Sequence, residues 1–127
     1  MKILRLPLAV FLAVAVLTLA ARAADLTGNW KWISQGTSGP VRISATFVHK
    51  DGNLTGTVTG RQGPAEISNA SIKDDVVTFT VTRGTTPNRV IFTYTGKITG
   101  DTIIGTIEKD AESASPSKSD WKAKRVK

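Results

Sequence analysis

The chain has 127 residues, enough for one domain with its own hydrophobic core. It contains no cysteine, which excludes disulfide bonds, thiolate metal sites and thiol nucleophiles. The formal net charge of +7 suggests a nucleic-acid ligand, but the distribution of the charge along the chain does not. Residues 24–117 carry nine Lys and Arg against nine Asp and Glu, so most of the chain is neutral and we expect no nucleic-acid partner.

The chain begins with the pattern of a secretion signal. Two basic residues precede an apolar run over 6–20, and Ala-Arg-Ala at 21–23 supplies small residues at the two positions that a signal peptidase reads. About 15 apolar residues are fewer than the roughly 20 of a spanning helix, which disfavours a membrane anchor. We predict a signal peptide over 1–23, one domain over 24–127, export to a bacterial periplasm or the medium, and no membrane span after cleavage.

The remainder is predicted to be all-β. It is rich in Thr, Val and Ile, glycine recurs at short intervals, and no stretch keeps the apolar spacing of a helix. Short links between strands favour an eight-stranded antiparallel up-and-down barrel, and a sandwich of two four-stranded sheets is the alternative. The expected strands are 27–34, 41–50, 53–60, 65–73, 76–83, 89–99, 102–109 and 120–126.

Three two-residue turns predict the register, because such a loop determines which residues face each other across a hairpin. In each hairpin the apolar residues fall on one face and Thr, Ser and Lys on the other. Gly96 is set opposite Gly105, which leaves a gap on the inward face, either part of a cavity or a barrel corner. The tight turns are 51–52, 74–75 and 100–101, and the longer links 35–40, 61–64, 84–88 and 110–119 gather at the other end, where we expect any ligand to enter.

Motifs lie at both ends of the predicted barrel. Gly28-Asn29-Trp30 opens the first strand, and the last strand ends with Trp121 and Arg125. This arrangement resembles the calycin signature of lipocalins and avidins, and Leu-Thr-Gly-Thr at 54–57 resembles avidin-type strands. The resemblance implies a calycin-like barrel in which the Arg125 cation packs on the Trp30 indole, so that Gly28, Trp30 and Arg125 serve structural closure.

The chain also resembles a family of small exported bacterial β-barrel proteins of uncharacterised activity. The shared motifs are Gly-x-Trp-x-Trp at 28–32, Leu-x-Gly-x-x-x-Gly at 54–60 and Trp-x-Ala-x-Arg at 121–125. This resemblance spans most of residues 28–126. It implies a barrel and export, and it implies no activity.

Candidate ligand-binding residues gather at the loop end. Trp32 and Trp121 lie toward it, Arg61 lies at its rim, and the register sets Glu66 opposite Arg83 on the inward face. Aromatic faces beside guanidinium groups can hold an anionic or amphipathic ligand, or a sugar ring. The favoured alternative is core indoles with a rim salt bridge. About 20 inward apolar side chains also favour a filled interior, although a barrel of this size can hold one small ligand.

The sequence offers little for catalysis. His49 is the only histidine, so we expect no catalytic residue, no metal site and no cofactor. We therefore predict a non-enzymatic exported module that binds a small amphipathic or anionic ligand. The alternative is a periplasmic, protein-binding inhibitor of a hydrolase that inserts residues 24–27 or a loop into its target.

The excess positive charge lies in the last ten residues. Such a segment can contact anionic lipid, cell-wall polymer or nucleic acid, but a solvated strand face is the favoured interpretation. Outward-facing Ile91 and Ile104 suggest a patch for self-association, although single surface apolar residues are ordinary. The basic residues of this segment are Lys118, Lys122, Lys124, Arg125 and Lys127, against Asp120 alone.

Overall fold

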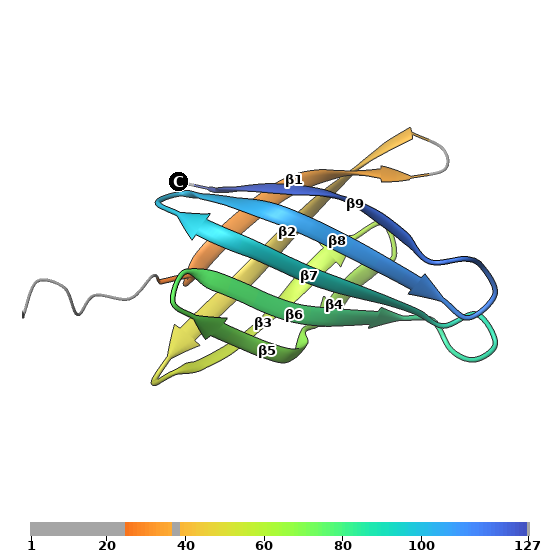
Figure 1. The fold of residues 1–127 in the computed structure, drawn as a ribbon, viewed down its shortest axis with the longest axis horizontal. Helices are drawn as coiled ribbons and strands as arrows, with labels where there is room; N and C mark the ends of the chain where they lie inside the picture. The colour runs from red at the N-terminus through yellow and green to blue at the C-terminus, as the bar shows by residue number, and fades with distance from the viewer. Residues whose placement is uncertain (1–24, 37–38, 127) are drawn as a thin grey trace, which may run out of the picture.

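The computed structural model describes residues 25–36 and 39–126, and the predicted signal peptide over 1–23 lies outside them. The described chain forms β-strands without helices, so it holds no helix long and apolar enough to cross a membrane. Nine strands make one antiparallel sheet rolled into a nearly closed barrel (Figure 1). They are β1 (Gly28–Gly36), β2 (Gly39–Lys50), β3 (Asn53–Gly60), β4 (Gly63–Glu66), β5 (Ser68–Lys73), β6 (Val76–Arg83), β7 (Val90–Thr99), β8 (Thr102–Ala111) and β9 (Ser117–Arg125).

The all-β, antiparallel prediction is confirmed, and so is the register at the tight turns. The strand order β4-β3-β2-β1-β9-β8-β7-β6-β5 is a meander whose first and last long strands, β1 and β9, pair with each other. Gly96 faces Gly105 and Phe47 faces Gly56, as the two-residue turns require. Asp51 and Asp74 take positive φ angles of 54° and 58°, which a tight turn demands and Asp tolerates.

The predicted count of eight strands is wrong, because residues 65–73 form two strands. β4 pairs with β3, whereas β5 pairs with β6. The chain changes partner at Ile67, whose backbone N–H donates to the Gly56 carbonyl at 3.0 Å. A bulge follows, in which Asn69 and Ala70 together face Phe79. In the sheet order β4 and β5 are the two edge strands, so the sheet does not pair with itself between them.

The links at the loop end are shorter than predicted. β1 extends to Gly36 and β2 begins at Gly39, so most of the expected 35–40 link is strand. The expected 61–64 link is reduced to a turn at 61–62, since β4 begins at Gly63. β8 and β9 likewise extend into the expected 110–119 link. The longer strands raise the barrel wall at this end.

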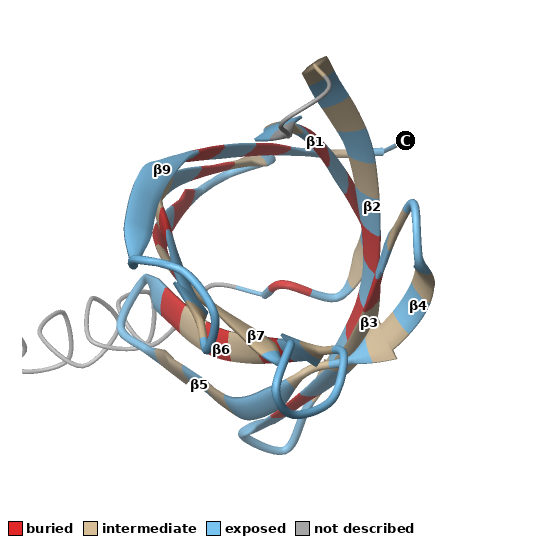
Figure 2. Ribbon diagram, turned by 90° about the vertical axis from the view of Figure 1, so that its right-hand side faces the viewer, coloured by how far each residue is buried: buried red, intermediate tan, exposed pale blue. Residues whose placement is uncertain are grey.

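Aromatic side chains fill the tight-turn half of the barrel. Phe79 stacks on Tyr94 with ring centroids 4.7 Å apart, and both rings contact Trp121 edge-on at 5.7 and 5.0 Å. The predicted gap between the facing glycines is not a cavity, because a Cβ on Gly96 would lie 3.0 Å from the Trp121 ring. Figure 2 shows buried residues alternating with more exposed ones along the strands.

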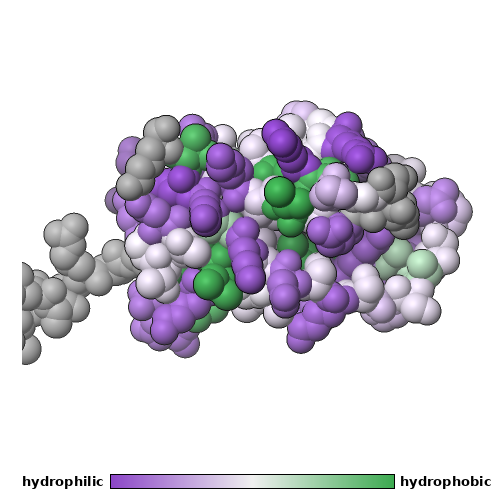
Figure 3. Space-filling view, turned by 90° about the horizontal axis from the view of Figure 1, so that it is seen from above, coloured by the Kyte–Doolittle hydropathy of each residue, from purple (hydrophilic) through white to green (hydrophobic). Residues whose placement is uncertain are grey.

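The outer surface is mostly polar. Figure 3 shows one face, viewed from above the β1 and β9 side, where apolar side chains are set among hydrophilic ones. Ile33 and Ile104 are the most exposed large apolar residues of the described chain, at 60% and 58%. Ile91, which was expected to face outward, is half-buried.

Candidate functional site

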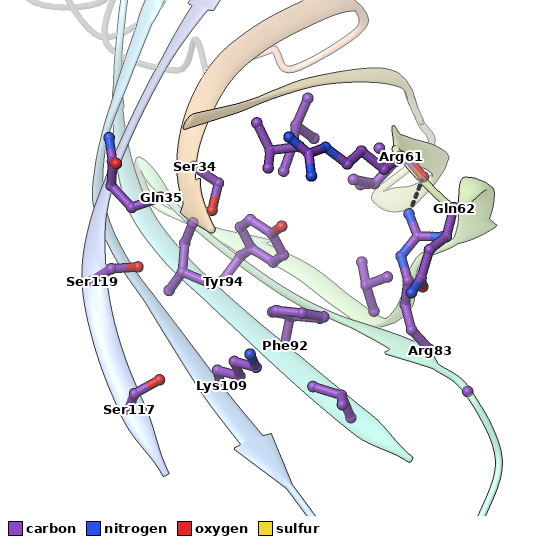
Figure 4. A pocket seen from close by; sticks show the side chains of 18 of the residues that line it. Ser34, Gln35, Arg61, Gln62, Arg83, Phe92, Tyr94, Lys109, Ser117 and Ser119 are labelled. Atoms are coloured by element: carbon purple, nitrogen blue, oxygen red, sulfur yellow. Dashed lines mark hydrogen bonds between the residues drawn. The ribbon is translucent and has the colours of Figure 1, made fainter. Parts of the chain in front are cut away.

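The loop end of the barrel opens into a cavity of about 600 Å³. It lies above the aromatic core, within the size range of small-molecule sites, roughly 300 to 1,000 Å³. Its wall is apolar and its rim polar (Figure 4). The apolar wall consists of Val41, Ile43, Val58, Val81, Val90, Phe92, Tyr94 and Ile107, and the polar residues are Ser34, Gln35, Arg61, Gln62, Arg83, Asn88, Lys109, Ser117 and Ser119.

Side-chain size explains why the barrel is open at this end. Each strand carries an inward-facing row of alternate residues, and every row continues past the aromatic core to the loop end. On β1 and β9 the inward positions beyond Trp32 and Trp121 are occupied by Ser34, Ser117 and Ser119. These small side chains cannot fill the space that the indoles fill below them, so the cavity remains.

Tyr94 forms part of the cavity wall at the boundary with the core. Its side chain is only 3% exposed and packs on Phe79 and, edge-on at 5.6 Å, on Trp32. Burial raises the pKa of the Tyr94 hydroxyl to about 12, and the positive charge of Arg83 offsets only part of this rise. The hydroxyl is therefore neutral at physiological pH, and it places no negative charge in the cavity.

Trp32 and Trp121, expected to contact a ligand, lie beneath the cavity instead of lining it. Both are buried, with ring centroids 5.5 Å apart. The Trp121 indole N–H has no hydrogen-bond partner within the described part of the chain, whereas the Trp32 indole N–H lies close enough to the Tyr94 hydroxyl to lower its pKa. They support Tyr94 from below, and their faces are not available for stacking on a sugar ring in the cavity.

Three cationic side chains border the cavity. Half-buried Arg83, at the end of β6, donates from Nη2 to the backbone carbonyl of Val58 on β3 at 3.1 Å. Arg61, from the β3–β4 turn, and Lys109, from β8, extend toward the space between the walls (Figure 4). Among the described residues that line the cavity there is no Asp or Glu. Positive charge in a concave site with apolar walls focuses an attractive potential for anions.

Glu66 does not take the predicted position opposite Arg83. It faces Thr57 of β3, is exposed, and does not line the cavity. The reason is the partner change at Ile67, which leaves Glu66 on β4 while the following residues pair with β6. The structure therefore brings Arg83 and Arg61 together at the cavity without the carboxylate expected beside them.

The residues assigned to closure meet at the tight-turn end. The Arg125 guanidinium lies 4.5 Å from the centroid of the Trp30 ring, and it donates to Asp101 and to the backbone carbonyls of Thr27 and Asp25 at 2.6 to 3.0 Å. A Cβ on Gly28, whose φ is +134°, would lie 3.2 Å from Arg125 Nη1.

Residues 25–27 also belong to this closure. Leu26 is fully buried and its carbonyl accepts the Trp30 indole N–H at 2.9 Å, so it forms a plug across the barrel end. Thr27 exchanges hydrogen bonds with the backbone of His49, and its own N–H donates to Asp25. The hydrogen bonds from Thr27 lower the pKa of Asp25. The segment is thus anchored to the barrel.

Nowhere in residues 25–36 and 39–126 do three His, Asp or Glu side chains come together in a group that could hold a metal ion.

Comparisons of this chain with protein-family models, curated proteins and solved structures find no match.

Sequence reasoning did not single out Phe92, Tyr94 or the serines as site residues, although the signal was present. Each lies on the inward face of its strand by simple alternation, as Arg83 and Lys109 do. Extending these inward rows to the loop end would have identified most of the lining.

Proposed function

We propose that this protein is an exported, non-enzymatic binding module, with a calycin-like barrel that holds one small amphipathic anion in its loop-end cavity. The observation that carries the proposal is the lining, in which Arg61, Arg83 and Lys109 stand over apolar walls with no acidic residue among them. A carboxylate or sulfate on a short hydrocarbon matches both features. Export is supported by the signal-peptide pattern over 1–23.

The ligand would lie with its anionic group at the rim and its apolar part inside. Guanidinium groups bind carboxylates through two parallel hydrogen bonds, and Arg83 retains donors beyond the one used for Val58. The hydrocarbon would contact Phe92 and the aliphatic wall above Tyr94. Because the Tyr94 hydroxyl is neutral, it does not repel an anion above it.

The hydrolase-inhibitor alternative has less support. It requires residues 24–27 or a loop to insert into a target, but Leu26 is buried and Arg125 is hydrogen-bonded to Thr27 and Asp25. Insertion of that segment would remove the plug from the barrel. We therefore retain the small anion as the proposed ligand class.

A cavity-blocking variant tests where such a ligand binds. Ser119 lines the cavity, so Ser119→Trp places an indole in the proposed binding space. The matched control is Ser71→Trp on the exposed outer face of β5. Titration with a fluorescent fatty acid should show binding to the wild type and to Ser71→Trp, and loss of binding in Ser119→Trp. Equal binding by both variants would place the ligand elsewhere and contradict the proposal.

A further inference from the structure

A second concave surface lies on the outside of the barrel, where β1 and β9 separate. The two strands pair only at Trp30 with Arg125 and at Lys31 with Lys124. Beyond this point β1 continues with β2 alone, and a groove of about 580 Å³ remains beside it. The groove is lined by Lys31, Trp32, Ile33, Arg42, Ile43, Lys122 and Lys124.

The groove is strongly cationic. Four of its seven lining residues are Lys or Arg, and none is Asp or Glu. Lys122 lies opposite Ile104 of β8, which lies opposite Lys97 of β7, so the basic surface continues across the sheet. The nearest acidic residue on this face of β9 is Asp120, two positions from Lys122 and opposite Thr106.

The same surface carries the most exposed aliphatic side chains of the described chain. Ile33 lies within the groove and Ile104 beside it, each more than half exposed. Figure 3 shows this face, with apolar side chains surrounded by hydrophilic ones. A soluble polyanion would use the cations alone, whereas a lipid surface uses both features: lysines attract anionic headgroups, and aliphatic side chains enter the headgroup–acyl boundary.

From this combination we propose that the β1–β9 groove and its Ile104 flank dock the protein onto an anionic lipid bilayer. The lysines and Arg42 attract the anionic headgroups, and Ile33 and Ile104 make apolar contacts with the acyl chains. A polyanion without an apolar part would make only the ionic contacts. The groove and the loop-end cavity share only Ile43 among their lining residues, and the cations of the two sites are different, so the inference does not depend on the cavity ligand.

Vesicle sedimentation tests the inference. The protein is purified as the cell exports it, and its intact mass is measured first, because retained residues 1–23 would themselves bind lipid. We expect binding to phosphatidylcholine vesicles containing phosphatidylglycerol and little binding to phosphatidylcholine alone. The Lys122→Gln/Lys124→Gln variant should weaken the binding by roughly 30-fold, as expected for the loss of two cations at a membrane surface.

Matched variants distinguish binding at this groove from nonspecific adsorption to vesicles. Replacing two exposed lysines near the tight turns, as in Lys50→Gln/Lys73→Gln, should have a much smaller effect than the groove pair. Ile33→Ser/Ile104→Ser should weaken vesicle binding at least fivefold. Its control is Val48→Ser/Val76→Ser, which removes two other exposed apolar side chains.

Three outcomes would overturn the inference. The first is absence of binding to the anionic vesicles, and the second is equal effects of the groove variants and their controls. The third is vesicle binding that Ile33→Ser/Ile104→Ser leaves unchanged while soluble dextran sulfate competes fully, which would identify a polyanion site. Ser119→Trp should retain vesicle binding, so failure of the cavity proposal is distinguishable from failure of this one.

Discussion

The Arg83 guanidinium on β6 donates a hydrogen bond to the Val58 carbonyl on β3 at 3.1 Å, across the one seam where the sheet does not pair with itself. Among the described residues, two hydrogen bonds outside the strand pairing cross to β3 at this seam: this one and the bond from the Ile67 backbone N–H to the Gly56 carbonyl. Arg83 therefore holds the barrel wall at the edge of the cavity while presenting its charge there.

Replacement of Arg83 should affect both stability and binding. Arg83→Ala leaves the Val58 carbonyl without this donor, so we expect the free energy of unfolding to fall by about 1 to 2 kcal/mol and the affinity for an amphipathic anion to fall about tenfold. Urea denaturation and ligand titration measure the two effects. Lys109→Ala is the control for the stability measurement, since Lys109 lines the cavity without bridging the seam. A stable Arg83→Ala variant with wild-type affinity would contradict both roles.

Loss of Arg125 should destabilise the tight-turn end. Arg125→Ala removes three hydrogen bonds from a charged group and the contact with Trp30, so the free energy of unfolding should fall by roughly 2 to 3 kcal/mol. The neighbouring exposed residue provides a control, and Lys124→Ala should change stability by less than about 0.5 kcal/mol. Equal stabilities of the two variants would show that the Arg125 contacts do not close the barrel.

The glycine facing the Trp121 ring should not tolerate a methyl group. A Cβ on Gly96 would lie 2.6 Å from Ile103 Cγ2 and 3.0 Å from the indole, so Gly96→Ala should cost about 1 to 3 kcal/mol. Gly60→Ala is the matched control, because the nearest atoms to its Cβ are 3.9 Å away. Thermal unfolding compares the two variants. Equal melting temperatures would mean that the core accommodates the added methyl group.

Stability should fall at alkaline pH because of Tyr94. The folded-state pKa of Tyr94, about 12, exceeds the ordinary value of 10, so the unfolded chain loses this proton first as the pH rises. The free energy of unfolding therefore falls between pH 10 and pH 12. The loss should approach roughly 3 kcal/mol and be absent in Tyr94→Phe. Tyr94 is the only tyrosine, so tyrosinate absorbance reports its titration directly. Titration near pH 10 in the folded protein would contradict the burial argument.

Much of the fold could be predicted because local signals determine it. Two-residue turns set the pairing of Gly96 with Gly105, and alternation set which residues face inward. The ninth strand was missed because the alternation of apolar and polar residues over 65–73 was taken as one continuous strand. The inward-packed residues run 65 and 67, then 70 and 72, and this shift of one position marks the bulge after Ile67.

The candidate site was only partly predictable, for a geometric reason. Alternation tells which side chains face inward, but their height along the barrel depends on strand tilt and stagger, which sequence does not show. Trp32 and Trp121 were therefore placed at the mouth although they lie below it. Arg61 and Arg83 were assigned to the rim and do line the cavity, because both stand next to loop-end turns.

The most direct test of the central claim compares decanoate with decanol by calorimetric titration of the wild-type protein. The two ligands share a hydrocarbon chain and differ in charge, so a cavity with three cations and no acidic lining should bind decanoate at least about tenfold more tightly. This preference should shrink to about threefold or less in Arg61→Gln/Lys109→Gln. Equal affinities for the two ligands in the wild type, or no binding of decanoate, would contradict the account.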